Sequence, residues 1–290
     1  MTTLVSAPPT SFPASADVQA IIRLALAEDI GRGDITTEAT VPVGATATAE
    51  ILQKAPGVVC GLPVVEAVFA ALDRRVHVEA FVEEGTYSDT HRATVARIEG
   101  PAAAILNGER TALNFLQRLS GVATASRRAS ELVHGTRATV IDTRKTTPGL
   151  RVLEKYAVRV GGATNHRAGL DDGFLIKENH IRAAGGITNA VTAAQHRAAP
   201  GQIVEVEVTT LDELDEALRA GATLILLDNF SAELMRSAVA QANRRARLEA
   251  SGGITLANLR QVAETGVDFI SLGALTHSAG VLDFSLEVLI

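Results

Sequence analysis

The second half of the chain alternates short apolar runs with amphipathic segments. Six runs of β-branched and aliphatic residues predict buried strands, at Thr139–Ile141, Gly173–Ile176, Ile203–Val208, Thr223–Leu227, Arg247–Ala250 and Asp268–Leu272. Helical periodicity separates them, near Leu150–Val160, Ala190–Ala198, Leu211–Ala220, Ala232–Arg244 and Leu256–Thr265. Thr210 and Ser231 are placed to cap two of these helices. The alternation predicts a parallel sheet with crossover helices, most simply an α/β barrel.

A doubly wound sheet is the structural alternative to the barrel. Against it, no glycine-rich dinucleotide turn follows the first predicted strand. Gly31-Arg32-Gly33, in the turn Glu28–Thr37, lacks both the third glycine and the preceding strand of that fingerprint.

The first half of the chain has a less regular pattern. A helix is predicted from Asp17, as its N-cap, to about Ala27, and another from Pro63 to about Leu72. A helical pattern from Ala102 to Val133 is predicted to break near Ser120-Gly121. Alternating or apolar runs predict strands at Ala45–Leu52, Val58–Cys60, Val76–Phe81 and Thr94–Ile98. This mixture predicts an α+β domain.

These patterns divide the chain into parts. Residues 1–16, rich in Pro, Ser, Thr and Ala, predict a disordered tail. Residues 17–134 form the predicted N-terminal α/β domain and residues 135–278 the barrel domain, with residues 279–290 placed to pack back on the N-terminal domain.

Composition narrows the class of protein and its partners. The chain has 290 residues, 47% of them hydrophobic and 21% charged, with a net charge of -6, which indicates a soluble globular protein that does not bind nucleic acid. A single cysteine, Cys60, favours a reducing compartment. The N-terminal tail lacks the basic start of a secretory signal, and no apolar run approaches the ~18 residues of a membrane span. We therefore expect a cytoplasmic protein without a membrane partner.

Polar residues follow each predicted barrel strand at the point where it ends. Arg144 and Lys145 follow the first strand and Lys177 the second, while His166 and Arg167 lie in the loop between these two strands. Because the carboxyl ends of parallel strands meet at one face, these cationic or potentially cationic groups should converge. Their convergence predicts a pocket for a small, multiply anionic ligand.

The last two strand ends carry glycine. Ser251-Gly252-Gly253 ends the fifth strand and Leu272-Gly273-Ala274 the sixth. Such loops leave backbone N–H groups available and let a phosphate approach without a Cβ in the way. We predict that a terminal phosphomonoester binds at these loops, a recurrent feature of barrels. The alternative is that the glycines serve only tight packing between strand and helix.

Carboxylates lie at the ends of the two middle strands. Glu207 and Asp228 predict Mg²⁺ held partly through water and a diphosphate. Glu205 and Glu207 have the same parity and are predicted to point into the barrel. Buried carboxylates need cations to meet them, so part of the set has an alternative interpretation as a neutralised polar barrel interior. The residue pattern alone predicts a barrel enzyme that binds phosphorylated, anionic substrates and Mg²⁺. It does not identify the reaction.

Several motifs together resemble the quinolinate phosphoribosyltransferases, also called carboxylating nicotinate-nucleotide pyrophosphorylases, from about Glu28 to the C-terminus. The motifs are NGERTALN (107–114), DTRKTTPGLR (142–151), GGATNHR (161–167), LIKENH (175–180), EVE (205–207), LDN (227–229) and SGGI (251–254). They occur in the order typical of the family, and no motif position departs from its pattern. The resemblance implies an N-terminal α/β sandwich domain, an incomplete, TIM-like α/β barrel, and a homodimer whose active sites are shared between subunits. Further assembly of dimers is left open.

The resemblance also implies roles for individual residues. Arg110, which from its pattern alone belongs with Glu109 to a solvated helix surface, would reach across the dimer interface. Lys145 would lie between the two substrates, quinolinate and phosphoribosyl pyrophosphate (PRPP), and with Glu207 and Asp228 would be catalytic. Glu207 and Asp228 would bind ribose hydroxyls and Mg²⁺-pyrophosphate. By the same resemblance, the two carboxylates of quinolinate would be held by Arg144, His166, Arg167 and Lys177, and Thr143 would also contact a substrate. The 5′-phosphate would bind at the loops Ser251-Gly252-Gly253 and Leu272-Gly273-Ala274.

The implied reaction is phosphoribosyl transfer with decarboxylation, which gives nicotinate mononucleotide in NAD biosynthesis. The quaternised pyridine ring is the electron sink for loss of CO₂, so we expect Mg²⁺ and no organic cofactor. Two alternatives stay open: a related phosphoribosyltransferase with another acceptor, such as the homologue linked to molybdenum transport, and a non-catalytic, ligand-sensing barrel.

Overall fold

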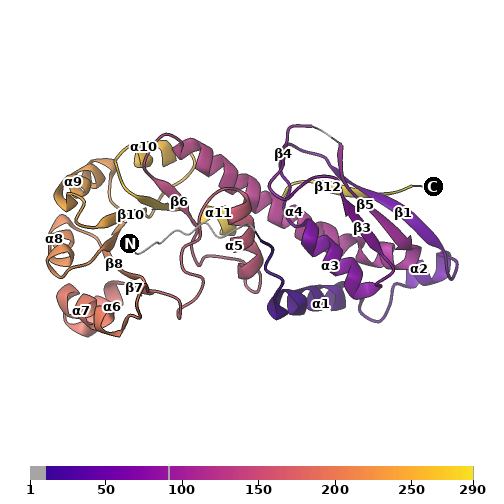
Figure 1. Cartoon of the computed structure of the whole chain (residues 1–290), viewed down its shortest axis with the longest axis horizontal. Helices are drawn as coiled ribbons and strands as arrows, with labels where there is room; N and C mark the ends of the chain where they lie inside the picture. The colour runs from indigo at the N-terminus through magenta and orange to yellow at the C-terminus, as the bar shows by residue number, and fades with distance from the viewer. Residues whose placement is uncertain (1–10, 91, 290) are drawn as a thin grey trace. The chain divides into compact units, whose positions relative to one another are not determined.

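A computed structural model describes residues 11–90 and 92–289 of the chain (Figure 1). These residues form two compact units. The N-terminal unit comprises residues 11–127, Thr147–Gly162 and 278–289, and the barrel unit comprises Arg128–Thr146 and Ala163–His277. Residues 147–162, assigned from the sequence to the barrel domain, thus group with the N-terminal unit.

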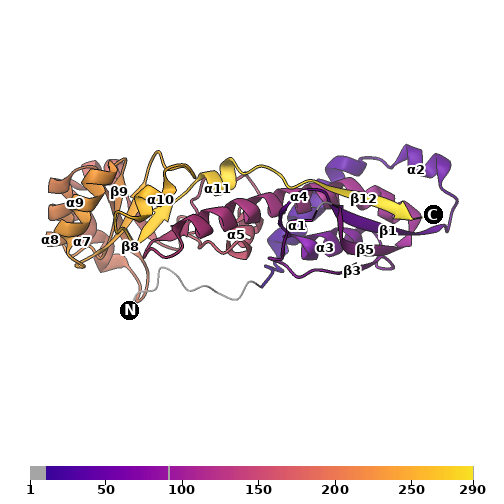
Figure 2. The ribbon, with the colours of Figure 1, turned by 90° about the horizontal axis from the view of Figure 1, so that it is seen from above.

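An antiparallel sheet forms the centre of the N-terminal unit. Its strand order is β12-β1-β5-β3, so the C-terminal strand pairs with the first strand of the chain (Figures 1 and 2). The strands are β1 (Thr46–Gln53), β3 (His77–Ala80), β5 (Ala93–Pro101) and β12 (Phe284–Leu289), with a separate pair of β2 (Gly57–Val58) and β4 (Tyr87–Ser88). The helices are α1 (Ala16–Ile30), α2 (Ile35–Thr40), α3 (Leu62–Leu72), α4 (Ala102–Val133, in this unit to Arg127) and α5 (Arg151–Val160).

The start of the chain corrects one expectation and tests part of another. Ser15, rather than Asp17, is the N-cap of α1, because its hydroxyl accepts a hydrogen bond from the backbone N–H of Val18 at 3.4 Å. Most of the predicted disordered tail, residues 1–10, lies outside the described residues. In the described part, Phe12 packs edge-on against Tyr156, with ring centroids 5.6 Å apart.

Helix α4 continues through Ser120-Gly121, where a break was predicted, so that prediction was wrong. The Ser120 hydroxyl bonds to both the N–H and the carbonyl of Cys60, at 2.9 and 3.1 Å, and so anchors the helix. A Cβ on Gly121 would collide with the carbonyl oxygen of Gly280. The glycine therefore permits close packing of a distant segment and does not end the helix.

The barrel unit is built on one parallel sheet. The order β6-β11-β10-β9-β8-β7 leaves β6 and β7 as its two edges, which makes the barrel incomplete. The strands are β6 (Thr139–Ile141), β7 (Phe174–Ile176), β8 (Val204–Val208), β9 (Leu224–Asp228), β10 (Arg247–Ser251) and β11 (Phe269–Ser271). The helices are α6 (Glu178–Ala184), α7 (Ile187–Arg197), α8 (Leu211–Arg219), α9 (Ala232–Ala242), α10 (Leu259–Ala263) and α11 (Ala274–His277). The predicted fold, an α/β N-terminal domain followed by an incomplete TIM-like barrel, is confirmed.

The helices α7, α8 and α9 lie on the outer side of the strands (Figures 1 and 2). The caps predicted for α8 and α9 are confirmed. Thr210 accepts a hydrogen bond from the N–H of Glu213 in α8, and Ser231 accepts one from the N–H of Leu234 in α9. Three short helices, α2, α6 and α11, were not predicted. No helix among the described residues is both long and apolar enough to cross a membrane.

Candidate active site

The carboxyl ends of the barrel strands bring the predicted polar residues to one edge of the sheet. Parallel pairing aligns Ser251 of β10 with Asp228 of β9, and Ser271 of β11 with Ile141 of β6. Lys177 directly follows β7, and Glu207 is the penultimate residue of β8. The register of the sheet therefore places these groups together at the carboxyl end of the strands, as expected for a barrel active site.

Lys177 and Glu207 form an ion pair at this edge. The Lys177 ammonium donates to Glu207 Oε2 at 2.7 Å, with side-chain exposures of 50% and 14%. A half-exposed lysine beside a carboxylate can exchange that partner for an anionic ligand at little cost, because such pairs contribute only about 0–1 kcal/mol.

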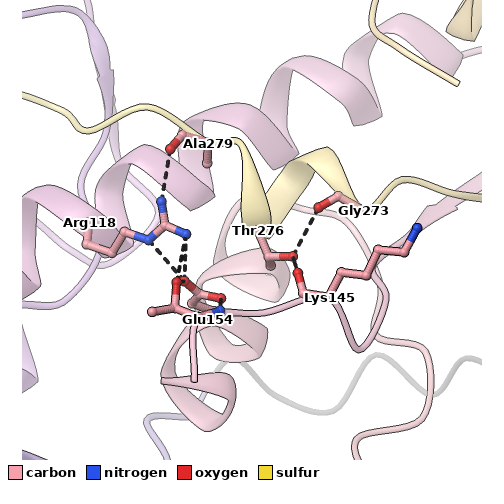
Figure 3. A network of polar contacts seen from close by, with 7 residues as sticks. Arg118, Lys145, Glu154, Gly273, Thr276 and Ala279 are labelled. Carbon is pink, nitrogen blue, oxygen red and sulfur yellow. Dashed lines mark hydrogen bonds and ion pairs between the residues drawn. The ribbon is translucent and has the colours of Figure 1, made fainter. Parts of the chain in front are cut away.

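The loop after β6 is held at several points along its backbone. Asp142 is fully buried, and its carboxylate accepts from the N–H of His166 and the amide of Asn165, each at 2.7 Å. The Lys145 carbonyl accepts from the hydroxyl of Thr276 at 2.7 Å (Figure 3), and the Lys145 N–H donates to Thr143 Oγ1 at 3.0 Å. The side chain of Lys145 is exposed. The loop thus presents an exposed ammonium group on a fixed backbone.

Two guanidinium groups lie near each other beside this loop. The pKa of Arg167 is lowered, first by burial and then by the positive charge of Arg144. Arg167 also donates to the carbonyl of Gly173 at 2.9 Å. Two neighbouring guanidinium groups repel each other unless an anion lies between them, and their planar forks suit carboxylates. The negative charges of Asp172 and Glu205 offset part of this repulsion, and the geometry of the two guanidinium groups suits a carboxylate-bearing ligand.

His166 has contacts that differ from the predicted one to a substrate carboxylate. Its Nδ1 accepts from the backbone N–H of Arg167 at 2.7 Å, and its Nε2 lies 3.0 Å from Glu205 Oε2. Glu205 is fully buried in the barrel interior, as its parity with Glu207 predicted. Both ring nitrogens of His166 therefore have partners within the chain.

Glu249 is a buried acidic residue beside His166 that the sequence analysis did not single out. It lies on β10, is 1% exposed, and has Oε2 3.5 Å from His166 Nε2. A charged residue flanked by Leu248 and Ala250 in a predicted buried strand was the available signal.

The two glycine loops differ in what their glycines permit. Gly252 has φ +92°, and a Cβ there would collide with the side chain of Asn229. A Cβ on Gly273 would lie 3.3 Å from Cδ of Lys145, so the last loop borders the Lys145 side chain. The first loop thus requires glycine for its backbone, and in the second a side chain at the glycine would crowd His277 and Lys145.

Asp228 and Arg110 are predicted site residues at different places in the fold. Asp228 ends β9 half-buried, and its Oδ2 accepts from the amide of Asn229 at 2.8 Å. Arg110 lies on α4 in the N-terminal unit, where its side chain is 59% exposed and 4.0 Å from Glu109. In a single chain its head group therefore faces solvent.

A second buried network lies in the N-terminal unit. Glu154 is fully buried, and Arg118 donates to its Oε1 from Nε and Nη2 at 3.0 and 2.6 Å (Figure 3). Thr147 adds its N–H to Oε2 at 3.0 Å and its hydroxyl to Oε1 at 2.7 Å, and Arg118 also donates to the carbonyl of Ala279. Glu154 thereby anchors Thr147 through both of its hydrogen-bond donors.

An incomplete barrel whose strand ends carry cationic side chains and glycine loops defines an enzyme of the type that acts on phosphorylated, anionic substrates. Comparison with known proteins identifies the family. Residues 34–120 match the family described as quinolinate phosphoribosyl transferase, N-terminal domain, and residues 122–287 match its C-terminal domain. The chain belongs to the quinolinate phosphoribosyl transferase family.

Individual relatives support this assignment over nearly the whole chain. The chain is 44% identical to the probable carboxylating nicotinate-nucleotide pyrophosphorylase of Bacillus subtilis, with 90% of each chain covered. It is 43% identical to the corresponding protein of Mycobacterium leprae, covering 92% of this chain and 95% of that protein. The solved structure of the nicotinate-nucleotide pyrophosphorylase of Francisella tularensis matches with a TM-score of 0.91 at 41% identity, covering 97% of this chain and 98% of that one.

Proposed function

We propose that this chain transfers the phosphoribosyl group of PRPP to quinolinate with decarboxylation, which gives nicotinate mononucleotide, pyrophosphate and CO₂ for NAD biosynthesis. The observation that carries the proposal is the pair of neighbouring guanidinium groups, Arg144 and Arg167, at the strand ends of a chain that belongs to this family. Quinolinate is a planar pyridine with two adjacent carboxylates, and it supplies two anions where two guanidinium forks lie close together.

The acceptor and the donor occupy different parts of the strand-end surface. Arg144, Arg167 and Lys177 bind the quinolinate carboxylates, and Lys177 leaves Glu207 to do so. The glycine loops bind the 5′-phosphate of PRPP, with Lys145 between the two substrates. A Cβ built on Gly273 would lie 3.3 Å from Cδ of Lys145, and this closeness of the loop to the Lys145 side chain supports the placement.

The reaction follows from these positions. The pyridine nitrogen attacks the anomeric carbon as its bond to the pyrophosphate oxygen breaks, and the leaving pyrophosphate takes that electron pair. The ring nitrogen is then positively charged, so the carbon–carboxylate bond at position 2 can break, its electron pair moving toward the ring. CO₂ leaves, and one proton from water replaces it at that carbon. The residues of the chain contribute orientation and charge stabilisation.

Glu207 and Asp228 are the carboxylates that we assign to the ribose and metal side of the site. A carboxylate oxygen at the end of β9 suits Mg²⁺, which prefers hard oxygen ligands and keeps several of its waters. Mg²⁺ would neutralise charge on the diphosphate. Asp228 would hold it, and Glu207, freed from Lys177, would accept from ribose hydroxyls. That Glu207 also holds Mg²⁺ stays a prediction.

We further propose a homodimer in which Arg110 of one copy completes the site of the other. Leu106, one helical turn before Arg110 on α4, is 36% exposed, and Leu24 on α1 is 71% exposed, which gives the N-terminal unit apolar surface beside that arginine's helix. Mixing Arg110→Ala with Lys145→Ala chains should restore activity that neither variant has alone, through mixed dimers with one intact site. No recovery after co-refolding would exclude shared sites.

The single cysteine and the composition support a cytoplasmic location, which we also propose.

The function is tested by following both products with purified protein, PRPP and Mg²⁺. Equal release of CO₂ and pyrophosphate with quinolinate, and no release with nicotinate as the control acceptor, is the expected result. Pyrophosphate without CO₂ would indicate a phosphoribosyltransferase with another acceptor. Release of neither product from folded protein would favour the ligand-sensing barrel.

A further inference from the structure

A buried polar cluster lies inside the barrel beneath the strand ends. His166 Nε2 is 3.0 Å from Glu205 Oε2 and 3.5 Å from Glu249 Oε2, and the His166 side chain is only 9% exposed. Glu205 lies on β8 and Glu249 on β10, on either side of β9 in the sheet. Two carboxyl groups from different strands therefore meet one imidazole in a space closed to solvent.

The cluster has too few hydrogen-bond donors for two carboxylates. Among the described residues, Glu205 Oε1 and both oxygens of Glu249 have no hydrogen-bond partner. Buried polar atoms in proteins are nearly always paired, and an ionised carboxylate without a partner is costly. Two adjacent buried carboxylates thus require a positive charge or a proton.

A metal ion is the first candidate for that role, because one ligand atom from each of the three residues lies within 4.8 Å of the others. The partner of the other imidazole nitrogen argues against it. Nδ1 of His166 accepts from the backbone N–H of Arg167, so in the neutral ring Nε2 must carry the hydrogen. A metal-bound histidine needs the Nε2 lone pair and usually donates its other N–H to a neighbour. The geometry therefore favours a proton shared by the two carboxyl groups.

The charge balance of the cluster agrees with a proton on Glu249. Burial raises the pKa of Glu249 well above its usual value and the negative charge of Glu205 raises it further, while His166 and the hydroxyl of Ser271 oppose the rise. Burial also raises the pKa of Glu205, to about 7, while a hydrogen bond from Glu249 and the charges of Arg167 and Lys177 oppose the rise. Glu205 therefore ionises first, and above about pH 7 Glu249 is the acid of the pair and Glu205 the carboxylate.

These contacts continue to the surface that binds the acceptor. Glu205 accepts from His166 Nε2, and His166 Nδ1 accepts from the N–H of Arg167. Asp142 accepts from the His166 N–H on the other side at 2.7 Å. The backbone of Arg167 is therefore fixed by the imidazole, and the imidazole is fixed by the pair of glutamates.

We propose that Glu249, as a neutral carboxylic acid that donates to Glu205, is a positioning residue which holds His166 and thereby Arg167 in place for the dicarboxylate acceptor. The proposal rests on the proposed function and deepens it, because it assigns His166 a supporting role and adds Glu249 to the acceptor half of the site. The donor half, at the glycine loops, should be insensitive to Glu249.

The test compares Glu249→Gln with Glu249→Leu in steady-state kinetics with each substrate varied. Glutamine keeps a donor for Glu205 at nearly the same volume, so its KM for quinolinate should stay within about twofold of wild type. Leucine removes the donor, and a misplaced Arg167 should raise the KM for quinolinate about tenfold and leave that for PRPP nearly unchanged. If the leucine variant does not fold, Glu249→Ala, which leaves room for water, replaces it. Glu264→Gln, the same change at an exposed pair with Arg260, is the control.

Three results would overturn the proposal. One is an unchanged KM for quinolinate in the folded leucine or alanine variant, and another is an equal loss for both substrates. The third is stoichiometric Zn²⁺ or Mn²⁺ retained by the wild-type protein after incubation and desalting but lost in Glu249→Gln. If wild type itself releases neither CO₂ nor pyrophosphate from quinolinate and PRPP, the proposed function fails instead, and that outcome is distinct from all three.

Discussion

Each unit of the chain contains a network around buried glutamate side chains, and the two networks stabilise the buried carboxyl groups differently. In the N-terminal unit, Glu154 is met by Arg118, through contacts of 2.6 and 3.0 Å, and by both donors of Thr147. In the barrel, Glu205 and Glu249 lie around one imidazole, and among the described residues three of their four oxygens have no hydrogen-bond partner.

The difference separates a structural role from a functional one. A buried carboxylate with a full set of charged and neutral donors anchors the structure, and its loss should lower the free energy of unfolding. A buried carboxyl pair without donors must hold a proton, which is an arrangement typical of functional sites. The same residue type thus stabilises the chain in one unit and, in our proposal, supports substrate binding in the other.

The largest expected effect is on the stability provided by the complete network. Arg118→Ala should lower the free energy of unfolding by about 3–5 kcal/mol, because it leaves the fully buried Glu154 without its cation. Arg219→Ala, which removes an exposed pair with Asp215, should cost about 0–1 kcal/mol. Urea unfolding measures both values. Equal losses would contradict the anchoring role of Glu154.

The next effect is on turnover and should leave stability intact. Lys145→Ala, and likewise Glu207→Ala, should lower kcat by ~10²–10³-fold, because each removes a charge from the reacting end of the site. Lys54→Ala, which removes a lysine paired with Asp283 in the N-terminal unit, is the matched control and should have normal turnover. Near-normal kcat in both active-site variants, with folding unchanged, would refute their roles.

A smaller effect should appear at the glycine loop of β10. Gly252→Ala introduces a Cβ at φ +92° and against Asn229, a strain of about 1–3 kcal/mol. The affinity for PRPP, measured by calorimetry, should fall by a similar free energy, while that for quinolinate stays constant. Gly162→Ala, at φ +88° with open space for the Cβ, is a control for backbone strain alone. Unchanged PRPP affinity in Gly252→Ala would remove the phosphate site.

The smallest effect is a pH dependence of stability in the barrel. The folded-state pKa of Glu205 is about 7, above its usual value of 4.5. A raised folded pKa gives stability that is fully present below pH 4.5 and is lost as pH rises through about 7. Wild type should therefore lose stability over this range, and Glu249→Gln should lose less, since the glutamine amide donates to Glu205 and does not itself titrate. Parallel curves for the two proteins, measured by chemical unfolding, would contradict the shared proton.

The sequence predicted the parts of the fold that depend on local pattern. The runs of β6 to β11 were located to within a residue or two, and Thr210 and Ser231 were recognised as caps, because hydrophobic periodicity and capping are local signals. The short helices α2 and α6 were missed, since one follows a two-glycine turn and the other immediately follows a strand.

What the sequence could not predict depends on contacts between distant segments. The continuity of α4 at Gly121 follows from the packing of Gly280, and the anchor of Glu154 needs Arg118 from another helix. The predicted strand ends located Arg144, Lys145 and Lys177, and the loop between two strands located Arg167. Glu249 stands out only when the barrel places it beside Glu205 and His166. Burial, and not residue type, distinguishes these glutamates.

The most direct test of the contrast between the two networks is infrared difference spectroscopy of wild type against Glu249→Gln at neutral pH. Wild type should show the carbonyl stretching band of a protonated carboxylic acid, Glu249→Gln should lack it, and Arg118→Ala should retain it. Identical carbonyl regions in folded wild type and Glu249→Gln would contradict a proton held between Glu205 and Glu249.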